Sequence, residues 1–411
     1  METVLINAIL AITILFLGLA GLIIIGKVWR EGLESYQRAH RAQLEPQVLA
    51  YAHGHQPSLA EVLGDELRRR DRGVLERILL DHAQRTRGVA HERLSQALEE
   101  LGFVDEMLAG LRSRRWWFRA SAAEKLGLAG AGRAADPLAA ALHDESSEVR
   151  MRAAKGLGAL GGRRSARVLI RALNEPNRWS TIRIADILTG MGREVVGELI
   201  DAFPGLDLSG KLAALDILSR IRPLQSAEWL VQRFTDAEPD VRARSAHALG
   251  CIGAPNSVGP LIEALGDPAW PVRAMAAKAL GRIRRTEAIP ELANRLRDPE
   301  WWVRSNAAHA LVATGTQGLR ALVGMLGDDD RYAEHQAVLM LEQAGVVDQQ
   351  ALSLARPPGP ERSTAIAFIR RLVSVGQIDR LEALATEHPN PKVREGLREL
   401  LPLEPDAAGA G

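Results

Sequence analysis

A repeat with a period of about 31 residues sets strong limits on how this chain can fold. Its clearest copies read VRMRAAKGLGALG from Val149, VRARSAHALGCIG from Val241, VRAMAAKALGRIR from Val272 and VRSNAAHALVATG from Val303. The last three copies begin at positions 241, 272 and 303, so their spacing is constant. Each copy predicts a helix with small residues at its centre, where a neighbouring helix can approach closely, and a glycine commonly follows to end it.

The same frame continues through weaker copies, so the repeat fills most of the chain. These copies begin at Ala90, Phe118, Ser180, Gly210, Ala333 and Thr364. Each first helix is followed by a second apolar segment, such as SVGPLIEAL or AIPELANRL, and Asp-Pro pairs at 267–268 and 298–299 mark where the next hairpin begins. The sequence therefore predicts an all-α fold, an α-solenoid of about ten stacked helical hairpins over residues 58–403.

With these segments in place, the chain resembles the HEAT-repeat family, in particular the short bacterial type found in phycocyanobilin lyase subunits and related scaffold proteins. That type has the frame D-P-x-x-x-V-R-x-x-A-A-x-A-L-G-x-I-G. The frame is matched here by Asp267, Pro268, Val272, Arg273, Ala276, Ala277, Leu280, Gly281 and Ile283. The resemblance implies a rod whose inner face is lined by the second helix of each hairpin, and it implies an architecture rather than an activity.

An apolar segment precedes the repeats. Residues 4–25 contain no charged side chain, and a helix of this length spans roughly 33 Å. Lys27, Arg30, Arg38 and Arg41 follow it and nothing basic precedes it, which places the carboxyl side in the cytoplasm. We therefore expect residues 1–26 to form one transmembrane helix that anchors the protein in the inner membrane.

The remaining boundaries follow from composition. Residues 27–57 are expected to form a juxtamembrane helix that ends at Pro46, followed by a linker. The final residues, 404–411, are small and unpatterned and are expected to be a disordered tail.

Composition and motifs narrow the possible chemistry. Lys and Arg number 52 and Asp and Glu number 51, so the chain has no overall basic field that would attract nucleic acid. A single cysteine, Cys251, excludes an intrachain disulfide and a zinc site built on cysteine pairs. The sequence contains no phosphate-binding loop, nucleophile elbow or HExxH motif. We therefore expect no enzymatic activity, no catalytic residue, no bound metal and no cofactor.

Six of the eight tryptophans share one place in the repeat, just before the first helix of a hairpin. Stacking would set them along one edge of the rod as candidate partner-binding residues, namely Trp116, Trp117, Trp179, Trp270, Trp301 and Trp302. One interpretation is structural, with each ring tucked between hairpins to cover the small-residue core. The other is a docking surface, since Trp with nearby Arg is typical of protein interfaces.

Two groups of arginines also stand out. The resemblance implies that the arginine after the first apolar residue of each copy pairs with acids between repeats. This structural role involves Arg119, Arg150, Arg242, Arg273 and Arg304 with Asp236, Asp267 and Asp298. The second group is a basic cluster on the helix after Gly162, which we include among the candidate partner-binding residues as Arg163, Arg164, Arg167 and Arg171.

These features favour a membrane-anchored, non-enzymatic scaffold that recruits or positions another, membrane-associated protein at the cytoplasmic face of the membrane. Two alternatives stay open. The first is a chromophore-lyase-like or other modifying or assembly factor, which the resemblance alone suggests. The second is a solenoid that binds nucleic acid or anionic lipid, which would need a continuous basic inner face. Acids on the second helices, such as Glu198, Asp201 and Glu263, interrupt such a face, so no nucleic acid is expected.

Overall fold

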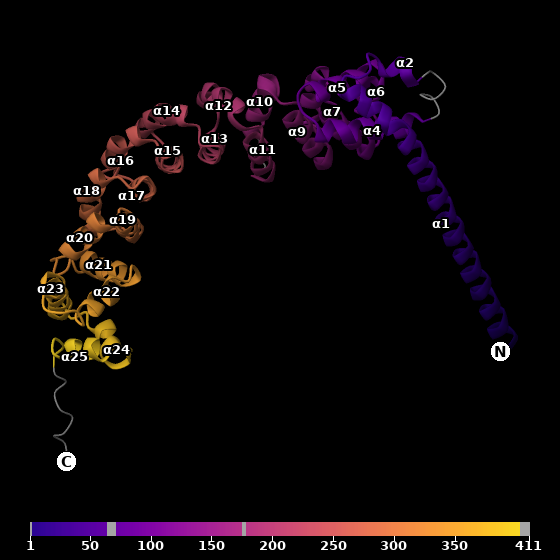
Figure 1. Cartoon of the computed structure of the whole chain (residues 1–411). Helices are drawn as coiled ribbons and strands as arrows, with labels where there is room; N and C mark the ends of the chain where they lie inside the picture. Colours follow the sequence, from indigo (N-terminus) through magenta and orange to yellow (C-terminus); the bar gives the residue numbers. More distant parts are fainter. Residues whose placement is uncertain (1, 64–70, 175–177, 403–411) are drawn as a thin grey trace. The chain divides into compact units, whose positions relative to one another are not determined.

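The structure is a computed structural model that describes residues 2–63, 71–174 and 178–402 (Figure 1). Every secondary-structure element in these ranges is helical, which confirms the all-α prediction. The chain divides into two compact units, residues 1–169 and residues 170–411. The tail at 404–411, for which we expected disorder, lies outside the described residues.

Unit 1 begins with one long helix and continues as packed hairpins. Its elements are α1 (Glu2–Ala52), α2 (Leu59–Leu63), α4 (Arg72–Arg85), α5 (Val89–Glu100), α6 (Phe103–Gly110), α7 (Trp116–Ala129), η1 (Gly132–Ala134), α8 (Ala135–Ala141), α9 (Ser147–Leu160) and most of α10 (Gly162–Arg171). Its first helices α7 and α9 pack side by side along their length. Gly127 and Gly156 permit this approach, because a Cβ on Gly127 would lie 2.4 Å from the Cα of Gly156.

Unit 2 repeats the hairpin from residue 170 onward. Its first helices are α11 (Arg178–Met191), α13 (Leu208–Ile221), α15 (Pro239–Ile252), α17 (Trp270–Ile283), α19 (Trp301–Ala313), α21 (Arg331–Gln343), α23 (Pro360–Ser374) and α25 (Pro391–Arg398). Its second helices are α12 (Val196–Ala202), α14 (Ala227–Val231), α16 (Val258–Ala264), α18 (Ile289–Asn294), α20 (Thr316–Gly324), α22 (Val346–Ser353) and α24 (Asp379–Glu387). Short 3-10 turns flank several of them, namely η2 (Ala172–Asn174), η3 (Gly192–Val195), η4 (Phe203–Gly205), η5 (Leu224–Ser226), η6 (Gln232–Thr235), η7 (Pro255–Ser257), η8 (Thr286–Ala288) and η9 (Arg295–Arg297).

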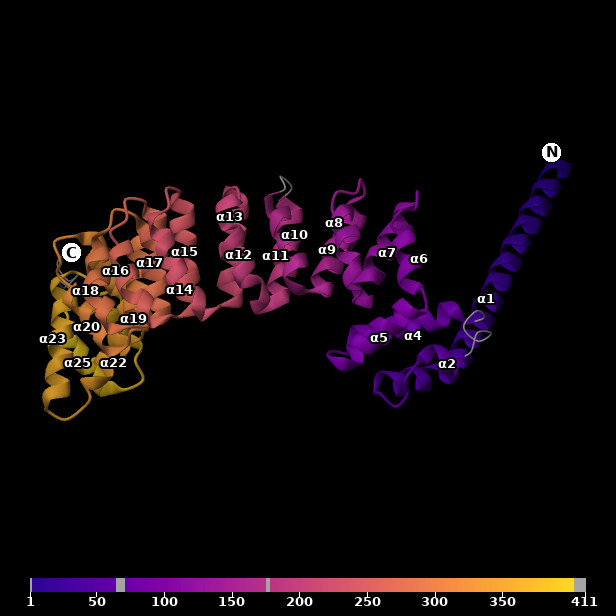
Figure 2. The ribbon, with the colours of Figure 1, turned by 90° about the horizontal axis from the view of Figure 1, so that it is seen from above.

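The first helices of unit 2 form its central row. Helices α13, α15 and α17 run side by side in Figure 2, and α19 packs directly on α17. Small residues set this spacing: a Cβ on Gly250 would lie 2.6 Å from the Cα of Ala279, and a Cβ on Gly281 would lie 2.8 Å from the Cα of Ala310. Ala277 is fully buried in this row. The stacked hairpins of the predicted α-solenoid are thus confirmed.

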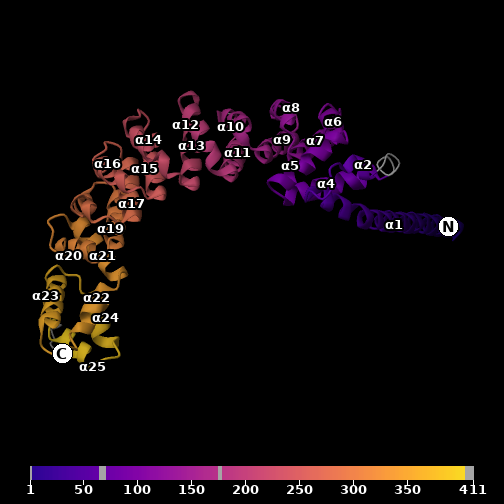
Figure 3. The same ribbon diagram turned by 45° about the horizontal axis from the view of Figure 1, so that its top comes forward.

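One expectation about this row is wrong. The resemblance implied that second helices line the inner face, but in unit 2 the first helices α13, α15, α17 and α19 lie on the inner side of the bend and α14, α16 and α18 lie on its outer side (Figures 1 and 3). The reason is the close approach of the first helices through Gly and Ala, because the row with the shorter spacing becomes the concave side of a curved stack.

Helix α1 continues beyond the point where the sequence predicted its end. Pro46 lies inside it and the helix runs to Ala52, so the expected linker begins only at His53. Burial of Val48 and Tyr51 against the following helices α4 and α5 explains this, since packing offsets the backbone hydrogen bond that a proline cannot donate.

The predicted localisation is also wrong. Among the residues that the structure describes, none of the helices is long and apolar enough to cross a membrane. The expected single-pass anchor at residues 1–26 in the inner membrane, with the solenoid in the cytoplasm, is therefore not supported. The apolar run at 4–25 is the first part of α1. This helix continues without a break into a charged segment that packs on α4, where Arg41 pairs with Asp81.

Candidate docking edge of the stacked helices

Bidentate ion pairs fix the loops in which the first helices begin. Arg273 donates from Nε and Nη2 to the two carboxylate oxygens of Asp298 at 2.7 and 2.8 Å, and from Nη1 to the carbonyl oxygens of Asp267 and Pro268 at 3.0 and 3.1 Å. The same arrangement joins Arg242 to Asp267 and Arg119 to Asp144. We call these three pairs the arginine–aspartate ladder. Each arginine ties its own loop to the loop of the next repeat.

The ladder carboxylates are charged although they are largely buried. Burial alone would raise the pKa of Asp298, but hydrogen bonds from Arg273 and from the Glu300 amide hold that pKa below its ordinary value. Burial would likewise raise the pKa of Asp267, but hydrogen bonds, of which that from Arg242 has the largest effect, lower this pKa overall. The hydrogen bonds from Arg119 are the main cause that lowers the pKa of Asp144.

Three positions that the resemblance assigned to this ladder are placed differently. Arg150 donates to the carbonyl oxygens of Asp144 and Glu145, and Asp236 accepts the amide of Glu238 at 3.0 Å in the loop before α15. Arg304 donates to two carbonyl oxygens, each at 2.8 Å, and its guanidinium lies over the ring of Tyr332 at 5.0 Å. The ladder therefore changes at Arg304 from a carboxylate partner to an exposed aromatic ring.

Four large rings lie at the amino-terminal ends of the neighbouring helices α17, α19 and α21. They are Trp270, Trp301, Trp302 and Tyr332, which we call the aromatic edge, and between 40% and 57% of each residue is exposed. Rings tucked between hairpins would be mostly buried. These residues instead leave about half of their surface facing solvent.

Ring–ring and guanidinium contacts hold three of the four rings of the aromatic edge in place. Trp301 and Trp302 pack edge to face with centroids 4.7 Å apart. Arg331 lies 4.9 Å from the centroid of Tyr332 and donates a hydrogen bond of 3.1 Å to its hydroxyl, which lowers the pKa of Tyr332. Together with Arg304, this makes an ordered group of Trp, Tyr and Arg side chains at the start of α19 and α21.

Sequence reasoning missed Tyr332 and Arg331 because their copy of the repeat has lost the Val-Arg signature. The repeat frame could have indicated both residues, because Tyr332 follows Trp302, and Arg331 follows Trp301, by slightly less than one full period. A shortened repeat thus carries the aromatic edge onward from α19 to α21.

The other candidate tryptophans are not part of this group. Trp116 and Trp117 lie at the start of α7 in unit 1, about half exposed, with ring centroids 6.0 Å apart and Arg115 over Trp117. The side chain of Trp179 lies outside the described residues. The structure therefore shows an aromatic pair in unit 1 and the aromatic edge in unit 2.

The basic cluster lies on α10, with all four of its arginines exposed. Arg163, Arg164 and Arg167 belong to unit 1, whereas Arg171 belongs to unit 2. Arg164 pairs with Asp136 of α8. At least one member of this cluster is thus already neutralised within the protein.

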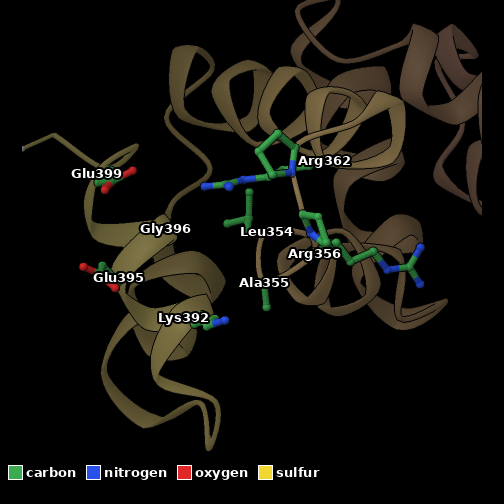
Figure 4. Close-up of a pocket in the computed structure, with 10 residues that line it drawn as sticks. Leu354, Ala355, Arg356, Arg362, Lys392, Glu395, Gly396 and Glu399 are labelled. Carbon is green, nitrogen blue, oxygen red and sulfur yellow. The ribbon is translucent and has the colours of Figure 1, made fainter.

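A pocket of about 440 Å³ lies near the carboxyl-terminal end of unit 2 (Figure 4). Arg362 on α23, Lys392 and Glu395 on α25, and Glu399 directly after α25 line it, together with the loop around Pro357. Figure 4 shows side chains of both charges around the opening. The pocket is therefore lined by side chains of both charges. It lies at α23 and α25, whereas the aromatic edge lies at α17, α19 and α21.

Comparison with known families agrees with the repeat architecture. A model of HEAT repeats matches residues 104–187 and 258–342. These ranges contain the α7 to α9 hairpins of unit 1 and the α17 to α19 hairpins of unit 2. The protein is thus an α-solenoid, and two of its segments match HEAT repeats. No curated protein sequence matches the chain.

Solved structures similar to the chain have low sequence identity to it. An engineered protein is 19% identical over 87% of this chain and 97% of its own, with a TM-score of 0.33. The complex of CpcE and CpcF of phycocyanin lyase from Nostoc sp. is 21% identical over 59% and 94%, with a TM-score of 0.27. Kap121p bound to Nup53p is 13% identical over 88% and 49%, with a TM-score of 0.43. At these values neither activity nor partner is transferred to this chain.

Proposed function

We propose that this protein is a non-enzymatic scaffold that binds another protein, and that the aromatic edge of unit 2 is its docking surface. The observation that carries the proposal is the half exposure of Trp270, Trp301, Trp302 and Tyr332 on three adjacent repeats. A solenoid of stacked hairpins offers extended surface of this kind.

Physical reasoning favours binding over a purely structural role. Aromatic side chains lose little conformational entropy on binding when neighbouring groups already hold them, as the edge-to-face contact of Trp301 and Trp302 does here. Trp, Tyr and Arg are also the residue types that dominate the binding energy of protein interfaces. The arginine–aspartate ladder also fixes the position of this surface, because Asp298 accepts hydrogen bonds from Arg273 and from the Glu300 amide in the loop directly before Trp301.

The test is site-specific photo-crosslinking from position 302 in the full chain, followed by identification of the captured protein and reconstitution with that protein in purified form. The double variant W301A/W302A should lose at least tenfold in affinity for the purified partner while circular dichroism shows an intact fold. Leu224→Ala is the matched control, since Leu224 is 62% exposed in η5 of the same unit, and should leave the affinity within twofold.

Two results would contradict the proposal. One is an equal loss of affinity in the Leu224 control. The other is a W301A/W302A chain that no longer folds, which would show that these rings are needed for the stack itself.

A further inference from the structure

A second surface of unit 2 lies at the opposite, carboxyl-terminal ends of its first helices, and it carries a short motif twice. Helix α13 ends at Arg220-Ile221, and Arg222 follows it; α17 ends at Arg282-Ile283, and Arg284 follows it. The two Arg-Ile-Arg motifs therefore stand at equivalent places two repeats apart. Between them, α15 ends in Cys251-Ile252 and is followed by Gly253.

The second arginine of each motif has an unfavourable backbone. In the described part of the chain, Arg222 and Arg284 are the two residues other than glycine with a positive φ, at 55° and 59°. Glycine takes this place after the neighbouring first helices, as Gly192 and Gly253 do with φ of 78° and 75°. An L side chain in the left-handed region is strained, so the fold alone favours glycine at both positions.

The repeat does not require a basic residue at this place for the helix dipole. Basic side chains stabilise a helix carboxyl terminus, yet α7, α9, α11 and α15 have no basic residue in the last turn. Ion pairing does not account for these arginines either: Arg220 pairs with Asp186 and Arg285 with Glu287, but within the described residues no carboxylate pairs with Arg222 or Arg284.

The surroundings of the two motifs are positively charged. The last turns of α13, α15 and α17, with the segments that lead into the next helices, carry Arg220, Arg222, Arg282, Arg284 and Arg285 against Glu228 and Glu287, and Asp186 on α11 pairs with Arg220. Arg282 donates at 2.8 Å to the sulfur of Cys251 rather than to a carboxylate. On the adjacent surface of α15, burial and then the charges of Arg282 and Lys278 lower the pKa of His247.

We call the carboxyl-terminal ends of α13, α15 and α17 the arginine edge. We propose that the arginine edge binds an acidic polypeptide segment, and that this role is independent of the aromatic edge. Arg222 and Arg284 are its two principal contacts. Packed helices lie about 8–10 Å apart, so these arginines are separated by roughly 16–20 Å across two intervals. An extended chain covers that span with about five or six residues. The partner is therefore an extended run of Asp or Glu residues of at least this length.

The test measures binding of fluorescein-labelled octaglutamate to the full chain by fluorescence anisotropy. The variant R222G/R284G should bind at least tenfold more weakly, and its melting temperature should not fall, because glycine relieves the strain and already stands at this place after α15. The variant R222K/R284K, which keeps the charge, should retain most of the affinity. The control R320Q/R370Q removes two exposed arginines on α20 and α23 of unit 2 and should bind within twofold of the wild type.

Each other outcome overturns the proposal. A fall in melting temperature for R222G/R284G would show that the arginines serve the fold. An equal loss in the control would show that octaglutamate responds only to net charge. Failure of the wild-type protein to bind octaglutamate would refute an acidic polypeptide as the partner. Binding of single-stranded oligonucleotide or anionic vesicles through Arg222 and Arg284 would then identify the arginine edge as a nucleic-acid-binding or lipid-binding surface.

Discussion

Replacing Arg273 by Met tests the main physical claim about the stack, that ladder pairs lock one repeat to the next. The substitution keeps much of the side-chain volume but removes all four hydrogen bonds of the guanidinium. Asp298, whose side chain is 2% exposed, would then keep only the Glu300 amide and a distant contact with Arg295 at 3.8 Å.

The expected cost follows from this burial. Breaking a buried ion pair by removing one partner destabilises a protein by about 3–5 kcal/mol, chiefly because the other charge is left without compensation. Arg304 provides the matched control, since it occupies the same place in the next repeat but bonds only to carbonyl oxygens and an exposed ring. Arg304→Met should cost about 1–2 kcal/mol, the value of two ordinary hydrogen bonds.

The assay is urea unfolding of the full chain by circular dichroism, with amide hydrogen exchange to locate the loss, because long repeat arrays need not unfold in one step. The cost of Arg273→Met should be largest at pH 7 and should shrink in acid. Without Arg273, burial raises the pKa of Asp298, so protonation removes the buried charge. Equal costs for the two variants, or a cost of Arg273→Met that does not change with pH, would refute the reasoning.

Other perturbations probe the packing and the charges of the stack. Ala277→Leu, at a fully buried position of α17, should overpack the stack and cost about 1–3 kcal/mol, and an unchanged thermal melt would contradict the close approach of the first helices. Gly281→Ala should also destabilise, by about 1–3 kcal/mol, because its Cβ would lie 2.8 Å from the Cα of Ala310. Gly259→Ala, with open space around it in α16, should instead raise the midpoint of urea unfolding slightly. The ladder carboxyls have pKa values below the ordinary 3.8 in the folded state. Their contribution to the free energy of unfolding should therefore be fully present above about pH 4 and be lost as the pH falls through the lowered values. Urea unfolding measured at a series of acid pH values would show this loss.

The candidate surface could be predicted from the sequence only in part. The frame placed Trp270, Trp301 and Trp302 at equivalent positions, and the structure sets them at the starts of the stacked helices α17 and α19. The frame did not reveal Tyr332, whose repeat is slightly shortened. It also gave no measure of exposure, because how much of a ring is covered depends on side chains from the neighbouring hairpin.

Residue patterns alone established the period, the helical hairpins and the small residues that let first helices approach, because these features are local and recur along the chain. The long apolar run was a weaker guide, since it forms the first part of a 51-residue helix whose charged remainder packs on α4 and α5. Three features became visible only in the folded chain: which row of helices lies on the inner side in unit 2, the contact of Arg304 with Tyr332 instead of a carboxylate, and the glycine-like backbone of Arg222 and Arg284. Each of these depends on contacts between repeats or on backbone angles that residue patterns do not specify.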